Sequence, residues 1–133
     1  MNETTIRGVR LMSIKQLLDT YYHGLARKSG WESTIADDFR FIGGDMTKQA
    51  PAVGKEIYTK IVQGLSTRFS DVKVLKTFVD GDEAFVLAQY DWIFPNGVNI
   101  TASVAESWKA KNGKLWELTI FFDTGSFDRL AKG

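Results

Sequence analysis

The 133-residue sequence contains no cysteine, one histidine and only two prolines. The lack of cysteine excludes disulfides, thiolate metal sites and cysteine nucleophiles. A single histidine cannot form a multi-histidine zinc site within the chain. We therefore expect neither a metal ion nor another cofactor.

The sequence also lacks an excess of either charge and any long apolar run. Lys and Arg number 17 against 16 Asp and Glu, so there is no basic surface of the kind that nucleic acid requires. No apolar run approaches the roughly 18 residues of a membrane span, and residues 1–10 lack the apolar region of a signal peptide. These absences predict a cytoplasmic protein that binds neither nucleic acid nor membranes.

Aromatic residues, in contrast, are plentiful. Four Trp, four Tyr and nine Phe make up 13% of the chain, and they need either a large core or a cavity to line. A chain of this length buries roughly two-thirds of its unfolded surface in one core. No repeat or linker divides it, so we expect a single domain over 1–133 with a core of about 13–130.

Three helices are predicted in the first half of the chain. Ser13 and Gln16 fit a capping box, and an apolar stripe at helical spacing follows, formed by Ile14, Leu17, Leu18, Tyr21 and Leu25. His23 lies nearly opposite this stripe, which predicts a solvent-facing or interface residue. A short second helix is expected over 31–38, a brief strand over 39–42, and a third helix over 55–68.

From residue 71 the apolar period changes to two, which predicts strands over 71–79, 83–94, 99–111 and 115–122. Asn96-Gly97 is a strong hairpin signal between the middle two. Helices gathered in one half and antiparallel strands in the other predict an α+β fold, with the helices packed on one face of the sheet.

Several segments in this order resemble the nuclear transport factor two-like superfamily, which includes SnoaL-like cyclases and ketosteroid isomerases. They are YYHGLARKSGWESTIADDFRF, GKEIYTKIV, FVDGDEAFVLAQYDW and NGKLWELTIFFD. The resemblance implies a cystatin-like cone, in which a curved antiparallel sheet wraps around three helices and leaves an apolar pocket. It also implies a homodimer formed through the sheet.

The catalytic groups of these relatives are mostly missing here. Ketosteroid isomerases use an aspartate base with a tyrosine and a protonated aspartic acid as oxyanion hole. The resemblance implies Tyr21 for the tyrosine, but it places the base near Gly43, two residues from Asp45, and the acid near Ala105. Glu106 is adjacent and, by strand alternation, on the other face from Ala105. The acid/base position of SnoaL-like cyclases falls at about Ile120.

The letters FDTGS, at 122–126, match the catalytic motif of aspartic proteases. Such a protease needs two aspartates that share a proton, and the chain offers one copy with few residues after it. Asp123 is therefore expected to accept backbone hydrogen bonds in a turn that starts a final helical segment.

Asp91 is the remaining candidate for chemistry. On its strand, Gln89 and Asp91 share one face with Phe85, Leu87 and Ile93. If that face lines the cone, the two polar groups form a binding spot; if it faces solvent or a dimer interface, Asp91 is a surface charge. A two-residue turn at Asn96-Gly97 pairs Asp91 with Ala102, and one more turn residue pairs it with Thr101.

Two functions are compatible with these residues. One is a protein that binds a small hydrophobic molecule, with a proton-transfer reaction of the isomerase or cyclase type in which Asp91 is the base and Tyr21 donates to the oxyanion. Its pocket would be lined by Gln89, Tyr58, Trp31, Phe41, Trp116, Leu118, Ile120 and Phe122. The alternative is a non-catalytic dimeric ligand-binding or protein-association domain whose cone is filled by side chains.

Overall fold

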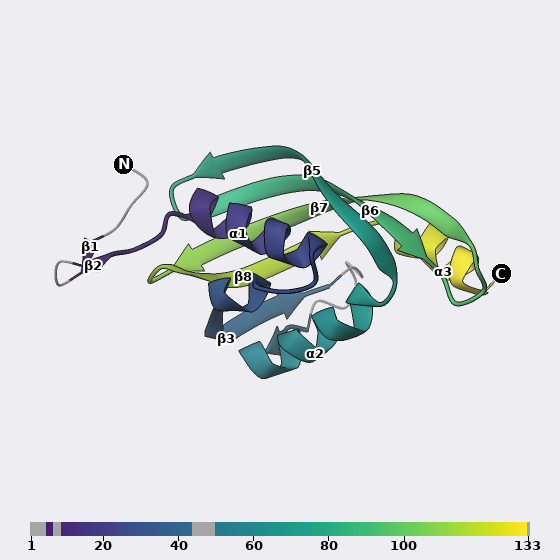
Figure 1. The fold of residues 1–133 in the computed structure, drawn as a ribbon, viewed down its shortest axis with the longest axis horizontal. Coiled ribbons are helices and arrows are strands. Elements are labelled where there is room, and N and C mark those ends of the chain that lie inside the picture. The colour runs from purple at the N-terminus through teal and green to yellow at the C-terminus, as the bar shows by residue number, and fades with distance from the viewer. Residues whose placement is uncertain (1–4, 7–8, 44–49, 133) are drawn as a thin grey trace.

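A computed structural model of the chain describes residues 5–6, 9–43 and 50–132 (Figure 1). The helices are α1 (Ile14–Ala26), the 3₁₀ turn η1 (Trp31–Thr34), α2 (Lys55–Ser66) and α3 (Thr124–Lys132). The strands are β1 (Thr5–Ile6), β2 (Val9–Arg10), β3 (Ile35–Ile42), β4 (Ala52–Val53), β5 (Phe69–Asp80), β6 (Glu83–Ile93), β7 (Asn99–Lys111) and β8 (Lys114–Phe121).

The main sheet has six strands in the order β4-β3-β8-β7-β6-β5. Strands β5 to β8 form an antiparallel meander, and β3 joins it parallel to β8. Figure 1 shows a curved sheet with α1 and α2 on its inner side and α3 beside the far end of β6. The predicted α+β architecture is confirmed.

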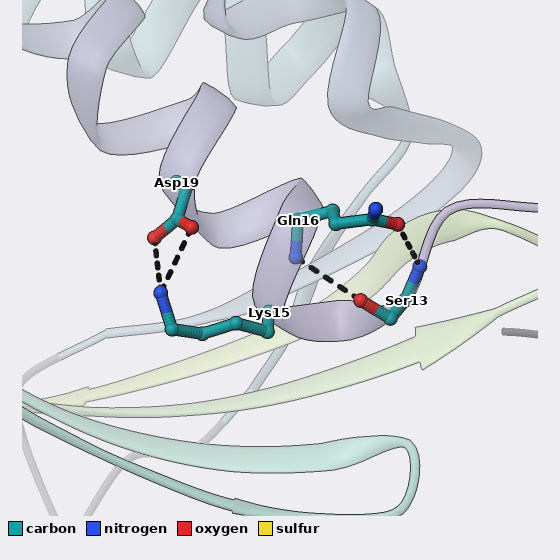
Figure 2. A network of polar contacts seen from close by, with 4 residues as sticks. All are labelled: Ser13, Lys15, Gln16 and Asp19. Carbon is teal, nitrogen blue, oxygen red and sulfur yellow. Dashed lines mark hydrogen bonds and ion pairs between the residues drawn. The ribbon is translucent and has the colours of Figure 1, made fainter. Parts of the chain in front are cut away.

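Helix α1 begins as its sequence predicts. The Gln16 backbone N–H donates to Ser13 Oγ at 3.2 Å, and the Ser13 N–H donates to Gln16 Oε1 at 2.9 Å (Figure 2). This capping box satisfies two of the amides that the first turn leaves without partners. The predicted stripe is buried, together with Tyr22 on its flank, while His23 is exposed.

The second helix is shorter than predicted. The 3₁₀ turn ends at Thr34, whose Oγ1 donates to the Trp31 carbonyl at 2.7 Å, and β3 begins at the next residue instead of at Phe39. A hydroxyl that bonds three residues back offers the backbone an alternative to further helix. Residues 35–42 then pair with β8 and β4, so tertiary pairing outweighs the helix-like pattern of this segment.

Strand β5 does not keep a single alternation. Its register shifts between Val74 and Lys76, as at a β-bulge. Val74 therefore pairs with the inward Ala88, whereas Phe78, three pairs of residues further on, lies opposite the outward Phe85. An extra residue in a strand reverses its faces and increases the bend, which helps the sheet to wrap around α1.

Asp123 caps α3. Its Oδ1 accepts from the Ser126 backbone N–H at 2.9 Å and its Oδ2 accepts from Ser126 Oγ at 2.7 Å. These hydrogen bonds lower the pKa of Asp123, whose carboxylate is exposed. The predicted turn-and-cap role of the FDTGS segment is confirmed.

Candidate functional site

Asp91 lies on the outer face of the sheet. It is exposed, and its Oδ1 accepts from Thr101 Oγ1 at 3.2 Å. The β6–β7 register pairs Asp91 with Thr101, which decides between the two registers compatible with the sequence. Gln89 is on the same outer face, with its Nε2 at 3.5 Å from Ser103 Oγ. The structure therefore does not bring the predicted base to Tyr21.

The inner face of β7 presents a different carboxylate, Glu106. It pairs with Val86 on β6 and Ile120 on β8, and its side chain is 2% exposed. Its even-numbered position puts it on the same face as Val104 and Trp108, which are both buried. The resemblance places the acid near Ala105, which lies on the opposite face of the same strand, so it points to the neighbour of the buried carboxylate.

Two tyrosines and a tryptophan surround Glu106. Tyr22 Oη donates to Glu106 Oε1 at 2.6 Å, and Tyr90 Oη lies 3.3 Å from Oε1 and 3.2 Å from Oε2. Trp108 Nε1 donates in turn to Tyr22 Oη at 2.9 Å. The buried carboxyl group is thus hydrogen-bonded, as a polar group in an apolar core must be to offset its loss of water.

Burial dominates the ionisation of this group. It raises the pKa of Glu106 to about 7 from an ordinary value of 4.5, although the hydrogen bonds from Tyr22 and Tyr90 lower it. Burial also raises the pKa of both tyrosines above 10, so their hydroxyls stay protonated near neutral pH. The cluster therefore has one group that exchanges a proton near neutrality.

A second hydroxyl pair lies beside this cluster. Tyr21 Oη and Tyr58 Oη are 2.6 Å apart, and either can be the donor. Both side chains are buried, and burial is the main cause that raises the pKa of each. Helix α1 thus supplies Tyr21 and Tyr22, and α2 supplies Tyr58, to one polar group of four tyrosines and one glutamate, which we call the tyrosine–glutamate cluster: Tyr21, Tyr22, Tyr58, Tyr90 and Glu106.

Aromatic rings fill much of the space between the helices and the sheet. The ring centroids of Tyr21 and Trp108 are 4.8 Å apart, and those of Phe39 and Tyr58 are 4.4 Å apart. Trp31 and Leu118, two of the predicted pocket residues, are buried in the same core. These residues are walls of the core around the cluster.

The inner face is less deeply buried toward α3. Seven side chains pack on the core while staying partly exposed: Phe41, Val72, Tyr90, Trp92, Ala110, Ile120 and Phe122. We call the four aromatic ones and Ile120 the mouth. Phe41, Ile120 and Phe122 are predicted pocket residues, and each packs against the core while staying partly exposed. Tyr90 belongs to both the mouth and the cluster, so it connects the apolar surface to Glu106.

Trp116 lies apart from these residues. Its Nε1 donates to Asp38 Oδ2 at 3.3 Å, and Lys111 Nζ sits 4.5 Å from its ring centroid. This places Trp116 in an exposed polar group between β3 and β8, away from the cluster. Asp45, the residue nearest to the implied base position, lies outside the described residues.

Other possible sites are less defined. A shallow depression of about 540 Å³ lies over α2, lined by Asp37, Lys55, Glu56, Thr59, Lys60 and Gln63. None of its lining residues belongs to the cluster or the mouth. Among the described residues, no group of His, Cys, Asp and Glu could hold a metal ion. Within the same part of the chain, each helix is too short or too polar to cross a membrane.

Solved structures of other proteins match the fold of this chain, whereas no protein-family model and no curated protein matches its sequence. A nuclear transport factor two-like protein of unknown function from Burkholderia pseudomallei K96243 superposes with a TM-score of 0.77 at 19% identity, over 90% of this chain and 97% of that one.

Two further solved structures are similar to a comparable degree. TerC, co-crystallised with polyporic acid, gives a TM-score of 0.76 at 18% identity, over 90% of this chain and 98% of that chain. A protein from Jannaschia sp. CCS1 with the provisional name of SnoaL-like polyketide cyclase gives 0.73 at 19% identity, over 86% and 88%. These TM-scores establish the fold. The identities are too low to show a shared activity, so any chemistry has to be argued from the residues of the site.

Proposed function

From the nuclear transport factor two-like fold of this chain, we propose that it binds a small hydrophobic carbonyl compound at the mouth and transfers protons to and from it through Glu106. The observation that carries this proposal is a buried carboxyl group that is hydrogen-bonded to Tyr22 and to Tyr90, and Tyr90 is itself partly exposed on the inner face of the sheet. A general base is most effective when its pKa is near the working pH, and that of Glu106 is raised to about 7.

The proposed reaction is the removal and return of a proton next to the carbonyl. Ionised Glu106 accepts the proton as the C–H bond breaks, and its electron pair moves onto the carbonyl oxygen to give an enolate. A tyrosine hydroxyl of the cluster donates a hydrogen bond to that oxygen, which stabilises the charge as it develops. Return of the proton to carbon restores the enzyme.

The co-crystallisation of TerC, which has a similar fold, with polyporic acid supports the choice of a small, oxygen-bearing organic guest. Polar groups placed within an apolar surface are typical of small-molecule sites. In this chain Tyr90 provides such a polar group among Trp92, Ile120 and Phe122.

The proposal is tested by exchange of the α-protons of 2-tetralone in D₂O, followed by NMR. The protein should accelerate the exchange, and Glu106→Gln should lower the rate by about 100-fold or more, because an amide cannot accept the proton. Asp91→Asn is the matched control, since Asp91 lies on the outer face. Equal rates for Glu106→Gln and the wild type, or loss of exchange in Asp91→Asn, would contradict the proposal.

A non-catalytic binding or association domain is the second candidate. Packing of the Tyr21, Tyr58 and Trp108 side chains around Glu106 and its neighbours favours it, because packed rings leave less room for a guest. In that case 2-tetralone would show no accelerated exchange at any protein concentration, whether or not it binds.

A further inference from the structure

The hydrogen bonds around Glu106 have a fixed direction. A tyrosine hydroxyl has one proton, and an indole N–H can only donate. Trp108 Nε1 donates to Tyr22 Oη, so the single proton of Tyr22 needs another partner. Among the described residues that partner is Glu106 Oε1, at 2.6 Å. Tyr22 therefore donates to Oε1 whether Glu106 is ionised or protonated.

This direction decides where Glu106 carries its own proton. Because Oε1 already accepts from Tyr22, the acid proton lies on Oε2. The neighbour of Oε2 is Tyr90 Oη, at 3.2 Å. Tyr90 thus donates to the ionised carboxylate but accepts from the protonated acid. In the second state the acceptor left in the cluster for the proton of Tyr90 is Oε1, at 3.3 Å, which already accepts from Tyr22 at 2.6 Å, so the oxygen of a guest can compete for that proton.

We propose that Trp108 and Tyr22 make Tyr90 a switched donor, which donates to Glu106 when the carboxyl group is ionised and to the oxygen of a guest when it is protonated. Trp108 is a positioning residue in this scheme, since it acts only through Tyr22. The identity of the guest, an apolar molecule with an acceptor oxygen, rests on the proposed function.

The surroundings of Tyr90 fit this role. Tyr21, Tyr22, Tyr58 and Glu106 are buried, whereas Tyr90 is partly exposed at the mouth. A guest that lies on the mouth therefore meets Tyr90 before the rest of the cluster. In the proposed reaction, the proton that Glu106 removes from carbon turns the Tyr90 hydroxyl toward the new enolate oxygen. Such a hydrogen bond forms only as charge develops, which is the kind that accelerates a reaction.

Of the ionisable groups in the cluster, Glu106 is the one that titrates near neutral pH. Helix α1 presents Tyr21 and Tyr22, α2 presents Tyr58, and β6 presents Tyr90. The flanking positions on β6 and β8 are the apolar Val86 and Ile120. Burial raises the pKa of these tyrosines, so the switch follows the protonation of Glu106 alone.

A pair of matched probes tests the switch with a guest. The dissociation constant of 2-acetylnaphthalene, measured by fluorescence between about pH 5 and about pH 9, should rise about tenfold as Glu106 ionises, because one hydrogen bond is lost. The dissociation constant of 2-ethylnaphthalene, which has no acceptor, should show no such step. Equal pH profiles for the two probes would overturn the proposal.

Single substitutions test which residues cause the pH-dependent step in the dissociation constant of 2-acetylnaphthalene. Tyr90→Phe should remove it, and Tyr21→Phe should keep it, because Tyr21 bonds to Tyr58 and not to Glu106. Trp108→Phe should flatten it, because Tyr22 is then free to accept the proton of Glu106. Tyr22→Phe removes the same constraint and replaces Trp108→Phe if that variant does not fold. A step retained in Tyr90→Phe, or unchanged in Tyr22→Phe, would overturn the proposal.

A measurement without any guest separates this inference from the proposed function. The infrared difference spectrum between about pH 5 and about pH 9 should show one tyrosine C–O stretching band that shifts as the hydroxyl changes from acceptor to donor. The band should vanish in Tyr90→Phe and remain in Tyr21→Phe. A band that persists in Tyr90→Phe refutes the switch. If neither naphthalene binds, the proposed function fails while this spectrum still decides the switch.

Discussion

Glu106 is the residue on which the proposed chemistry depends. Its carboxyl group lies between Val86 and Ile120 on the inner face of the sheet, and three aromatic side chains form its hydrogen-bonded surroundings. Placing an ionisable group in such a position costs stability whenever the group is charged. The same burial gives the group a pKa at which proton exchange is possible near neutrality.

The cost of this burial depends on pH. Below the ordinary pKa of 4.5, Glu106 is protonated in both the folded and the unfolded chain. As the pH rises from 4.5 to about 7, the unfolded chain loses the proton while the folded protein keeps it, so the free energy of unfolding falls. A shift of this size corresponds to about 3 kcal/mol in total.

Glu106→Gln should remove this dependence. Relative to the wild type, its free energy of unfolding should increase by about 3 kcal/mol between about pH 4 and about pH 8, as measured by urea unfolding at a series of pH values. Glu56→Gln, on the exposed side of α2, controls for the loss of one carboxylate. Parallel pH profiles for Glu106→Gln and the wild type would contradict this prediction, because they would mean that Glu106 has the same pKa in the folded and the unfolded chain.

At the scale of elements, the cluster depends on the close approach of α1 to the 3₁₀ turn η1. Gly24 permits this approach, because a Cβ atom there would lie 2.5 Å from the Trp31 backbone nitrogen and 2.9 Å from the Ser29 carbonyl oxygen. Neither backbone atom can move without shifting an element. Helix α1 carries both Tyr21 and Tyr22. Its position therefore also determines where their hydroxyls lie, and these hydroxyls hydrogen-bond to Tyr58 and Glu106.

Gly24→Ala should therefore destabilise the fold, by about 1–3 kcal/mol for an overpacked contact. Gly64→Ala is the matched control in α2, where an added Cβ meets nothing within 4 Å. That change should stabilise the protein by about 0.5–1 kcal/mol, because alanine has a higher helix propensity than glycine in a helix interior. Thermal and urea unfolding of the two variants measure the difference, and equal effects would contradict the packing described for Gly24.

At the scale of the whole molecule, the sheet has two faces with different surroundings. The inner face holds the core and the cluster, whereas the outer face presents two phenylalanines that pair across β5 and β6: Phe78 is 60% exposed and Phe85 is 40% exposed. The same face carries Asp71 and Asp91 as well as Lys73. We propose that a second copy of the chain covers this face, because a two-fold axis can set such acidic and basic groups opposite one another.

The double variant Phe78→Lys with Phe85→Lys tests this proposal. The wild type should sediment as a dimer and the variant as a monomer, because burying two ammonium groups of each copy in the interface is costly. Ile57→Lys is the control, since Ile57 is 50% exposed on α2, away from the outer face. A wild type that sediments as a monomer at every concentration, or a variant that stays dimeric, would contradict an interface on this face.

Local sequence by itself determined most of the elements. Ser13 and Gln16 define the start of α1, and the period of two from residue 71 onward produces the meander of β5 to β8. Asp123 could be interpreted as a cap because its hydrogen bonds reach only three residues along the chain. The α+β fold follows from these signals, since each depends on neighbours in sequence.

Only the tertiary structure decided which residues form the site. Strand alternation separates Asp91 from Tyr90 and Ala105 from Glu106, but it does not say which face the helices cover. That choice depends on the β6–β7 register, on the bulge in β5 and on the packing of α1, all of which join residues far apart in the chain. The pKa of Glu106 follows from the same long-range burial, so the strand sequence alone could not predict it.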